Sequence, residues 1–255
     1  MYTIAFANQK GGVGKTTSCV NIAAGLARSG KRVLLVDCDP QGNSTSGLGI
    51  AKKSVKHSVY DGILGERTVA DCAIQTPVEN LALIPSQIDL AGAEFELMDM
   101  ESREGALKRF LQTAEEYDLC CIDCPPSLSL LTVNALNAAS GVVIPMQCEY
   151  YALEGLTQLM LTIRKVKKLY NPSLCILGIL ITMYNGRLNL SVQVLDEIKK
   201  YYADKLFTTP IPRSVKLSEA PSYGIPGILY DPANKGSRAY DDVTRELMER
   251  IGLSF

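Results

Sequence analysis

Short apolar runs alternate with amphipathic stretches along most of this chain. The runs are typical of buried β-strands and lie at residues 2–7, 33–37, 81–85, 118–123, 141–146, 174–182 and about 206–210. Between most of them apolar residues recur at helical spacing, which predicts helices over residues 15–29, 103–116, 129–138, 152–169, 189–203 and 237–251. The stretch 44–102 has the weakest pattern, and there we expect mainly short helices and loops.

This alternation predicts an α/β fold with a single doubly wound, mainly parallel sheet and helices on both faces. No linker-like or low-complexity stretch divides the chain, so we expect residues 1–255 to form one domain. Because the first strand begins at residue 2, we expect no helix-turn-helix ahead of it. Ligands of such sheets bind at the carboxyl ends of the strands, and the polar motifs below follow strand ends.

Composition narrows the function classes. The chain is 47% apolar and 21% charged with a formal net charge of −1, so attraction to DNA would need a local basic patch. No apolar run is long enough to span a bilayer, no signal peptide is visible, and residues 249–255 are too short for a membrane-binding tail. We therefore expect a cytoplasmic protein without a membrane partner.

The eight cysteines fall mostly within apolar runs, where free thiols pack as small hydrophobes. Cys121 and Cys124 form a CxxC spacing, but no second pair completes a four-ligand metal or cluster site. An iron–sulfur function is therefore a minor alternative.

A glycine loop follows the first strand, and its residues 10–17 read Lys-Gly-Gly-Val-Gly-Lys-Thr-Thr. Its glycines let backbone N–H groups approach an anion, and the helix that follows directs its positive dipole end toward the same point. Lys15 adds a charge for the β- and γ-phosphates, and Thr16 offers a hydroxyl to Mg²⁺. We expect a triphosphate to be held by Gly11, Gly12, Val13, Gly14, Lys15, Thr16 and Thr17.

The loop departs from the usual P-loop pattern at its start. That pattern needs glycine at position 9, where this chain has Gln9, and a second lysine, Lys10, stands at the leading edge.

Three aspartates follow strand ends and are candidates for phosphoryl-transfer chemistry. Asp123 is placed to hold Mg²⁺ through its water shell, and Asp39 to orient the attacking water. Asp37 is expected to support the metal shell or to orient the loop. A capping or turn role is the alternative for one of the three, above all for Asp37.

Together with four further motifs, the glycine loop resembles the ParA/Soj branch of the deviant Walker A ATPases, a group that includes MinD. The motifs are residues 37–43 (DCDPQGN), 119–127 (LCCIDCPPS), 149–156 (EYYALEGL) and 210–222 (PIPRSVKLSEAPS). The resemblance implies a homodimer that sandwiches ATP, with Lys10 reaching the partner's nucleotide, and it assigns the water-orienting role to Asp39. It also implies a ParB-type partner that stimulates hydrolysis.

The sequence carries weaker signals for the contacts to the nucleotide base and to DNA. The guanine-specific N-K-x-D element is absent, since Asn234-Lys235 is followed by Gly236-Ser237. The resemblance implies adenine, with Asn185 and Pro212 as candidate contacts, although Asn185 is equally well explained as a turn residue before Gly186.

The resemblance also implies non-specific DNA binding by Arg187 and Lys216. Neighbouring basic residues complete a candidate basic group of Arg187, Arg213, Lys216, Lys235 and Arg238. Phosphate contacts of this kind give salt-sensitive, sequence-independent affinity, while isolated solvated cations are the alternative.

We therefore predict a weak ATPase, with Lys10, Lys15 and Asp39 as catalytic residues, that binds DNA as an ATP-bound dimer at the nucleoid. This dimer would drive chromosome or plasmid partition. The alternatives are a positioning ATPase for another cargo, and a metabolic enzyme on the same fold, such as an amidoligase or an iron–sulfur-loading protein. A membrane-bound MinD-like role is the nearest rival within the group.

Overall fold

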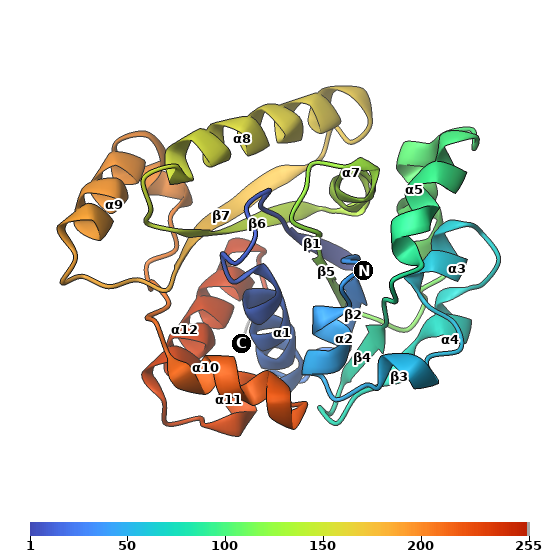
Figure 1. Cartoon of the computed structure of the whole chain (residues 1–255), viewed down its shortest axis with the longest axis horizontal. Coiled ribbons are helices and arrows are strands. Elements are labelled where there is room, and N and C mark those ends of the chain that lie inside the picture. Colours follow the sequence, from blue (N-terminus) through green and yellow to red (C-terminus); the bar gives the residue numbers. More distant parts are fainter. Residues whose placement is uncertain (254–255) are drawn as a thin grey trace.

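The computed structural model describes residues 1–253, and in this part of the chain seven strands form one sheet (Figure 1). The strands are β1 (Tyr2–Phe6), β2 (Val33–Asp37), β3 (Ile74–Gln75), β4 (Leu81–Ile84), β5 (Leu119–Asp123), β6 (Gly141–Gln147) and β7 (Cys175–Thr182). Their order is β3-β4-β2-β5-β1-β6-β7, and only β3 is antiparallel to its neighbour. The predicted mainly parallel α/β sheet is therefore confirmed.

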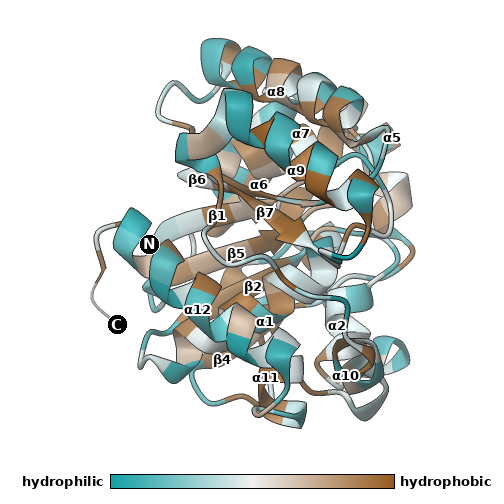
Figure 2. Cartoon of the chain, turned by 90° about the vertical axis from the view of Figure 1, so that its left-hand side faces the viewer, coloured by the Kyte–Doolittle hydropathy of each residue, from teal (hydrophilic) through white to brown (hydrophobic). Residues whose placement is uncertain are grey.

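Helices cover both faces of this sheet (Figures 1 and 2). The helices are α1 (Lys15–Arg28), α2 (Asn43–Gly47), α3 (Val59–Ile63), α4 (Val69–Cys72), α5 (Leu90–Met98), α6 (Ala106–Leu111), α7 (Leu130–Ala138), α8 (Ala152–Leu169), α9 (Asn189–Tyr202), α10 (Val215–Glu219), α11 (Gly227–Tyr230) and α12 (Lys235–Arg250). One core includes side chains of α1 and α12, and the other includes side chains of α3 to α9.

Apart from the short β3, the strands are mainly apolar because each contributes side chains to both cores. In β2 every residue is buried, with Leu34 and Val36 in one core and Val33 and Leu35 in the other. Successive side chains of a strand point to opposite faces, so a doubly covered strand needs an unbroken apolar run rather than an alternating one. Figure 2 shows the sheet as a largely hydrophobic layer between the two helical layers.

The register brings three strand ends together. Phe6 at the end of β1 pairs with Asp123 of β5, and Asp123 pairs in turn with Asp37 of β2. Because these strands are parallel, the loops that follow them open at the same side. We call this side, formed by the ends of β1, β2 and β5, the carboxyl edge.

The predicted elements need some corrections. The run at about 206–210 is not a strand: it makes an isolated bridge at Leu206, and a second isolated bridge lies beyond it at Pro212. Pro210 and Pro212 have no N–H to donate, and the Thr208 N–H donates to Glu246 instead, so a ladder along β7 cannot continue. The helix predicted over 103–116 is confined to α6, after a 3₁₀ turn at Arg103–Gly105.

Within residues 1–253, none of the helices combines the length and apolarity that a bilayer crossing requires. The interpretation of residues 249–255 as too short for a membrane-binding tail falls partly on residues 254–255, which lie outside the described residues.

Candidate active site

The glycine loop connects β1 to α1 at the carboxyl edge. Gly12 and Gly14 have φ angles of 72° and 80°, in the left-handed region that glycine adopts at little cost. Gly14 is the N-cap of α1, and no side chain caps this helix end. The first N–H groups of α1 are thus left for a ligand, and helix dipole and free donors together favour an anion here.

Lys15 is buried at the start of α1. Its Nζ atom donates a hydrogen bond to the main-chain oxygen of Lys10 at 3.1 Å, within the same loop. Burial lowers the pKa of Lys15, and the nearby Asp123 carboxyl partly offsets this effect. A cation held inside the loop beside uncapped N–H groups suits a phosphate, because the ligand would replace one weak carbonyl contact with charged oxygens.

Asp37 and Asp123 are fully buried neighbours on adjacent strands. Desolvation, with a smaller contribution from the nearby Asp123 charge, raises the pKa of Asp37 to about 7. Desolvation is also the largest cause for Asp123 and raises its pKa to about 6. Asp37 accepts bonds from Thr45 N at 2.8 Å, Thr45 Oγ1 at 2.7 Å and Asp39 N at 3.2 Å. These bonds occupy both carboxyl oxygens and favour a supporting role for Asp37.

Asp123 has an unused oxygen. Its Oδ2 atom accepts a bond from Ser44 Oγ at 2.8 Å, whereas its Oδ1 atom is buried without a hydrogen-bond partner among residues 1–253. An orphaned carboxylate oxygen beside a raised-pKa neighbour is costly unless a cation approaches it. The donor set, a carboxylate with the hydroxyls of Thr16 and Ser44 nearby, fits Mg²⁺, a hard cation that prefers oxygen ligands.

Asp39 lies two residues beyond the end of β2, in a tight turn. Its Oδ1 atom accepts a bond from Gln41 N at 2.9 Å, and its main-chain oxygen accepts a bond from Gly42 N at 2.8 Å. The side chain is held by this turn next to the carboxyl edge, where the predicted water-orienting role requires it.

Lys10 does not point into solvent in the single subunit. Its ammonium group pairs with Glu149, in the loop between β6 and α8. The end of β6 holds the glycine loop at a second point, where Gln147 Nε2 donates to Gly12 O at 2.7 Å. Both partners of the Lys10–Glu149 pair are about half exposed, so the contact is one that solvent or a stronger anion can replace.

A small cavity of about 80 Å³ lies beside the glycine loop, where a base could extend from bound phosphates. Pro212 lines it, with Gly14, Thr17, Met183 and Arg213 among the other lining residues. Asn185 is not part of this lining. It is exposed, and its Oδ1 atom accepts a bond from Arg187 N at 3.1 Å, as in a side-chain-stabilised turn.

The basic group is distributed over three neighbouring segments. The bridge between Tyr184 and Pro212 brings the turn of Arg187 toward Arg213, and a 2.8 Å bond between Ser214 and Asn234 joins that segment to the start of α12. All members except Lys216 are exposed. Lys216 pairs with Glu219 at 2.9 Å and lies 5.6 Å from the centre of the Tyr230 ring, so part of its charge is already compensated.

The CxxC pair does not form a chelating site. Cys121 belongs to the core that includes α1 and α12, and Cys124 belongs to the opposite core. Burial raises the pKa of Cys121 to about 12 and raises that of Cys124 as well, which disfavours the thiolate that a metal would need.

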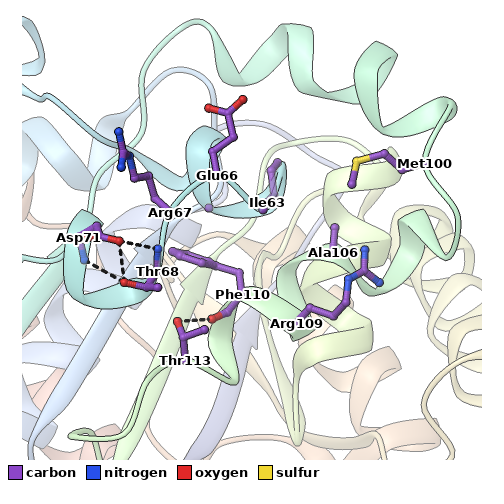
Figure 3. Close-up of a pocket in the computed structure, with 12 residues that line it drawn as sticks. Ile63, Glu66, Arg67, Thr68, Asp71, Met100, Ala106, Arg109, Phe110 and Thr113 are labelled. Carbon is purple, nitrogen blue, oxygen red and sulfur yellow. Dashed lines mark hydrogen bonds between the residues drawn. The ribbon is translucent and has the colours of Figure 1, made fainter.

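A separate hollow of about 340 Å³ lies between α3, α4 and α6 (Figure 3). Most of its polar contacts are local, and one, from Val69 N to Thr113 Oγ1 at 2.9 Å, joins α4 to the segment after α6. Thr68 and Asp71 bond to each other in the α4 capping box, and Thr113 bonds to the main-chain oxygen of Phe110, while Glu66 points outward (Figure 3). None of the sequence-predicted site residues lines this hollow.

Several contacts of the site were not predicted from the sequence. Ser44 and Thr45 on α2 hold the two buried aspartates, and Gln147 and Glu149 hold the glycine loop. Glu149 begins the 149–156 motif, so its position was marked in the sequence although its pairing was not.

Comparison with known proteins covers nearly the whole chain. A family model described as an AAA domain matches residues 1–176. The sporulation initiation inhibitor protein Soj of Bacillus subtilis (strain 168) is 58% identical over 245 residues, which cover 96% of this chain and 97% of that protein. The chromosome-partitioning ATPase Soj of Treponema pallidum (strain Nichols) is 50% identical over 251 residues, or 98% of both proteins.

One solved structure shares the fold closely. It is the structure of cobyrinic acid a,c-diamide synthase from Mycobacterium smegmatis with bound ATP analog and magnesium, with a TM-score of 0.88 and 38% identity. The match covers 99% of this chain and 96% of that chain. The likeness therefore includes both the carboxyl edge and the segments of the basic group.

Proposed function

This chain belongs to the family of Soj and ParA chromosome-partitioning ATPases, and on that premise we propose that it acts as an ATP-dependent dimerising switch on DNA. The chain is an ATPase that uses ATP and Mg²⁺. The observation that carries the proposal is the assembly at one carboxyl edge of an uncapped helix start, a buried lysine and three aspartates. We further propose that residues 1–255 work as a single ATPase domain.

The hydrolysis step follows from how this site holds charge. Lys15 and the N–H groups of the glycine loop bind the phosphates, with Val13, Thr16 and Thr17 in the same segment. Thr16 and Asp123 would hold the metal, and Asp37 supports them through α2. A bound Mg²⁺ would supply neutralisation of phosphate charge. Asp39 orients a water toward the γ-phosphate. Phosphoryl transfer needs positioning and charge neutralisation rather than a covalent nucleophile, and this set supplies both.

We propose that ATP closes a homodimer in which Lys10 leaves Glu149 for the partner's nucleotide. A triphosphate carries more negative charge than one carboxylate, so it offers the stronger site for the ammonium group. Two facing copies that each contribute a lysine make a two-fold symmetric interface, the commonest arrangement in soluble oligomers. Pro212 borders the base, with Asn185 as a weaker candidate.

DNA binding is assigned to the basic group of Arg187, Arg213, Lys216, Lys235 and Arg238. A dimer presents two such groups to one duplex, which raises avidity without any new contact. Hydrolysis then releases DNA by opening the dimer. We place the protein at the nucleoid, in the cytoplasm, with a ParB-type partner that stimulates hydrolysis and directs chromosome or plasmid partition.

One experiment tests ligand, assembly and output together. Wild-type protein is measured for DNA binding and for size with ATP, with ADP and without nucleotide. We expect a dimer and DNA binding with ATP alone, and Lys10→Ala should bind nucleotide but remain a monomer. Wild-type monomers that bind DNA equally in all three states would contradict the switch.

The role of Asp39 has its own test. Asp39→Ala should bind Mg-ATP and DNA, yet release phosphate at least about 100-fold more slowly, because an unpositioned water loses orientation. Asp89→Ala, which changes an exposed aspartate beyond β4, is the matched control and should hydrolyse normally. Full turnover by Asp39→Ala would remove Asp39 from the mechanism.

The solved synthase keeps an alternative open, an amide-forming enzyme on the same fold. Such an enzyme would couple ATP use to a small carboxylic acid and an amide donor, and DNA would not affect it. ATP turnover that depends on such substrates and not on DNA or a DNA-bound partner would favour this alternative. A positioning ATPase for another cargo would keep the switch but respond to a different partner.

A further inference from the structure

Lys52 reaches the Asp39 turn from outside the predicted site. It begins a 3₁₀ helix at Lys52–Ser54, after α2, in the stretch with the weakest sequence pattern. Its Nζ atom donates to the main-chain oxygen of Gln41, and Gln41 N donates to Asp39 Oδ1 at 2.9 Å. One residue, Gln41, is therefore held on one side by Lys52 while it holds Asp39 on the other.

Lys52 is itself held by the loop that follows β4. Gln87 follows the end of β4, and its Nε2 atom donates to the main-chain oxygen of Lys52 at 2.7 Å. The neighbouring Ser86 N donates to Thr45 Oγ1 at 2.9 Å, and Thr45 bonds to Asp37. The loop after β4 thus braces both the aspartate pair and the Asp39 turn.

The side chain of Lys52 also packs closely on this turn. Gly42 has a φ of +59°, and a Cβ atom at this position would come within 2.9 Å of both Lys52 Cε and Ser86 O. The turn and the lysine stem therefore touch with no room for a side chain between them, which limits how far the turn can move while Lys52 stays in place.

We propose that Lys52 is a positioning residue for ATP hydrolysis, which sets the direction of the Asp39 carboxylate through Gln41. The proposal rests on the proposed function, since Asp39 is the residue through which Lys52 acts. Loss of Lys52 leaves the Asp39–Gln41 turn intact but free to shift. A small displacement of a water-orienting carboxylate slows the chemical step far more than it weakens substrate binding.

The position suits mutagenesis because Lys52 is only half-buried. It borders an open cavity of about 350 Å³ together with Lys53, Gln87 and Ile88. Removing its ammonium group creates neither a closed cavity in a core nor an unpaired buried charge, which are the usual causes of large stability losses. The fold should therefore survive the change.

The test compares Lys52→Met with Lys53→Met, the same change at the next residue, which is exposed. We expect Lys52→Met to lower kcat for ATP about tenfold with KM within about twofold of wild type. Lys52→Arg should restore most of the rate, because its guanidinium can donate to the same carbonyl oxygen. Lys53→Met should behave as wild type, and the melting temperatures of all three variants should match.

A double variant separates this inference from the proposed function. If Lys52 acts through Asp39, Lys52→Met should cause no further loss in an Asp39→Ala background. A full additional loss there, or a wild-type kcat for Lys52→Met alone, would overturn the role of Lys52 while leaving that of Asp39. Full turnover by Asp39→Ala would overturn both. A fall in kcat that comes with a lower melting temperature and no rescue by arginine would make Lys52 merely structural.

Discussion

At the scale of single residues, the site is dominated by two carboxyl groups that the sheet forces together. Asp37 and Asp123 are register partners on β2 and β5, and both are fully buried. Hydrogen bonds from Ser44 and Thr45 offset only part of the cost of their charge. Apolar residues at these two positions would make the fold more stable. The buried pair therefore lowers stability, and ligand binding offsets this loss.

The pair predicts how stability depends on pH. Both folded pKa values lie above the ordinary aspartate value of 3.8, so between about pH 4 and 7 the folded state binds more protons than the unfolded state. The free energy of unfolding of the nucleotide-free protein therefore falls as pH rises through this window. Asp37→Asn removes one titrating charge and should reduce this fall.

Denaturant unfolding at pH 5 and pH 8, without magnesium, measures the effect. The stability of Asp37→Asn relative to wild type should increase by about 1–3 kcal/mol between the two pH values. Asp118→Asn is the control, because the Arg32 side chain lowers the pKa of Asp118 to about 2, below the measured range. A constant difference between Asp37→Asn and wild type would show that the pair does not titrate as described.

At the scale of elements, the approach of α1 to α12 depends on one glycine. A Cβ atom at Gly25 of α1 would lie 2.7 Å from Thr244 Oγ1 and 3.1 Å from its Cγ2 atom. Thr244 cannot turn away freely, since its hydroxyl donates to Tyr240 O at 2.7 Å. The glycine loop is carried by α1, so this packing also sets the position of the phosphate-binding groups.

We therefore expect Gly25→Ala to destabilise the protein by about 1–3 kcal/mol through overpacking, despite the better helix propensity of alanine. Gly92→Ala in α5 is the matched control, because nothing lies within 4 Å of its Cβ position, and it should stabilise by up to about 1 kcal/mol. Thermal or denaturant unfolding measures both. Equal stabilisation by the two changes would contradict the close packing.

The elements that could be predicted from the sequence are those with strong local patterns. The β1, β2 and β5 runs and the helices α1, α7, α8 and α9 were found within a few residues, because burial gives each strand an unbroken apolar run and each helix a helical period. Helices such as α3 and α4 were not resolved, since a helix of four or five residues has too few apolar positions to show one.

The site could be predicted only as far as its motifs reach. The glycine loop and the three aspartates are short sequence patterns that follow strand ends, so the parallel sheet brings them together without further information. Lys52, Gln87 and Glu149 act through contacts between distant segments, such as the 139-residue separation of Lys10 and Glu149. No local pattern in the sequence records such a pairing.

At the scale of the whole molecule, the proposed DNA binding depends on the basic group, because the formal net charge of the chain is only −1. Arg187→Glu should abolish most DNA binding at low salt and reduce the dependence of log affinity on log salt by about one or more. ATP-dependent dimerisation should persist. Lys108→Glu on α6 makes the same charge change at an exposed residue outside the basic group and should bind DNA nearly as wild type. Unchanged binding by Arg187→Glu would remove Arg187 from the surface.

Glu219 gives the opposite test on the same surface. It compensates Lys216, so Glu219→Gln should release that charge and strengthen DNA binding about two- to fivefold. A binding titration with ATP present measures the change. Weaker binding by Glu219→Gln would mean that Lys216 needs its partner to hold it toward the duplex.

The Lys10–Glu149 contact has a consequence for how copies of this protein meet. In a subunit without nucleotide, Lys10 already pairs with Glu149. A second empty subunit therefore offers Lys10 no stronger anion. A high local concentration of empty subunits on a chromosome would then not be enough to form the dimer. Under the proposed mechanism, association therefore depends on bound nucleotide, because the triphosphate is an anion strong enough to replace Glu149 as the partner of Lys10.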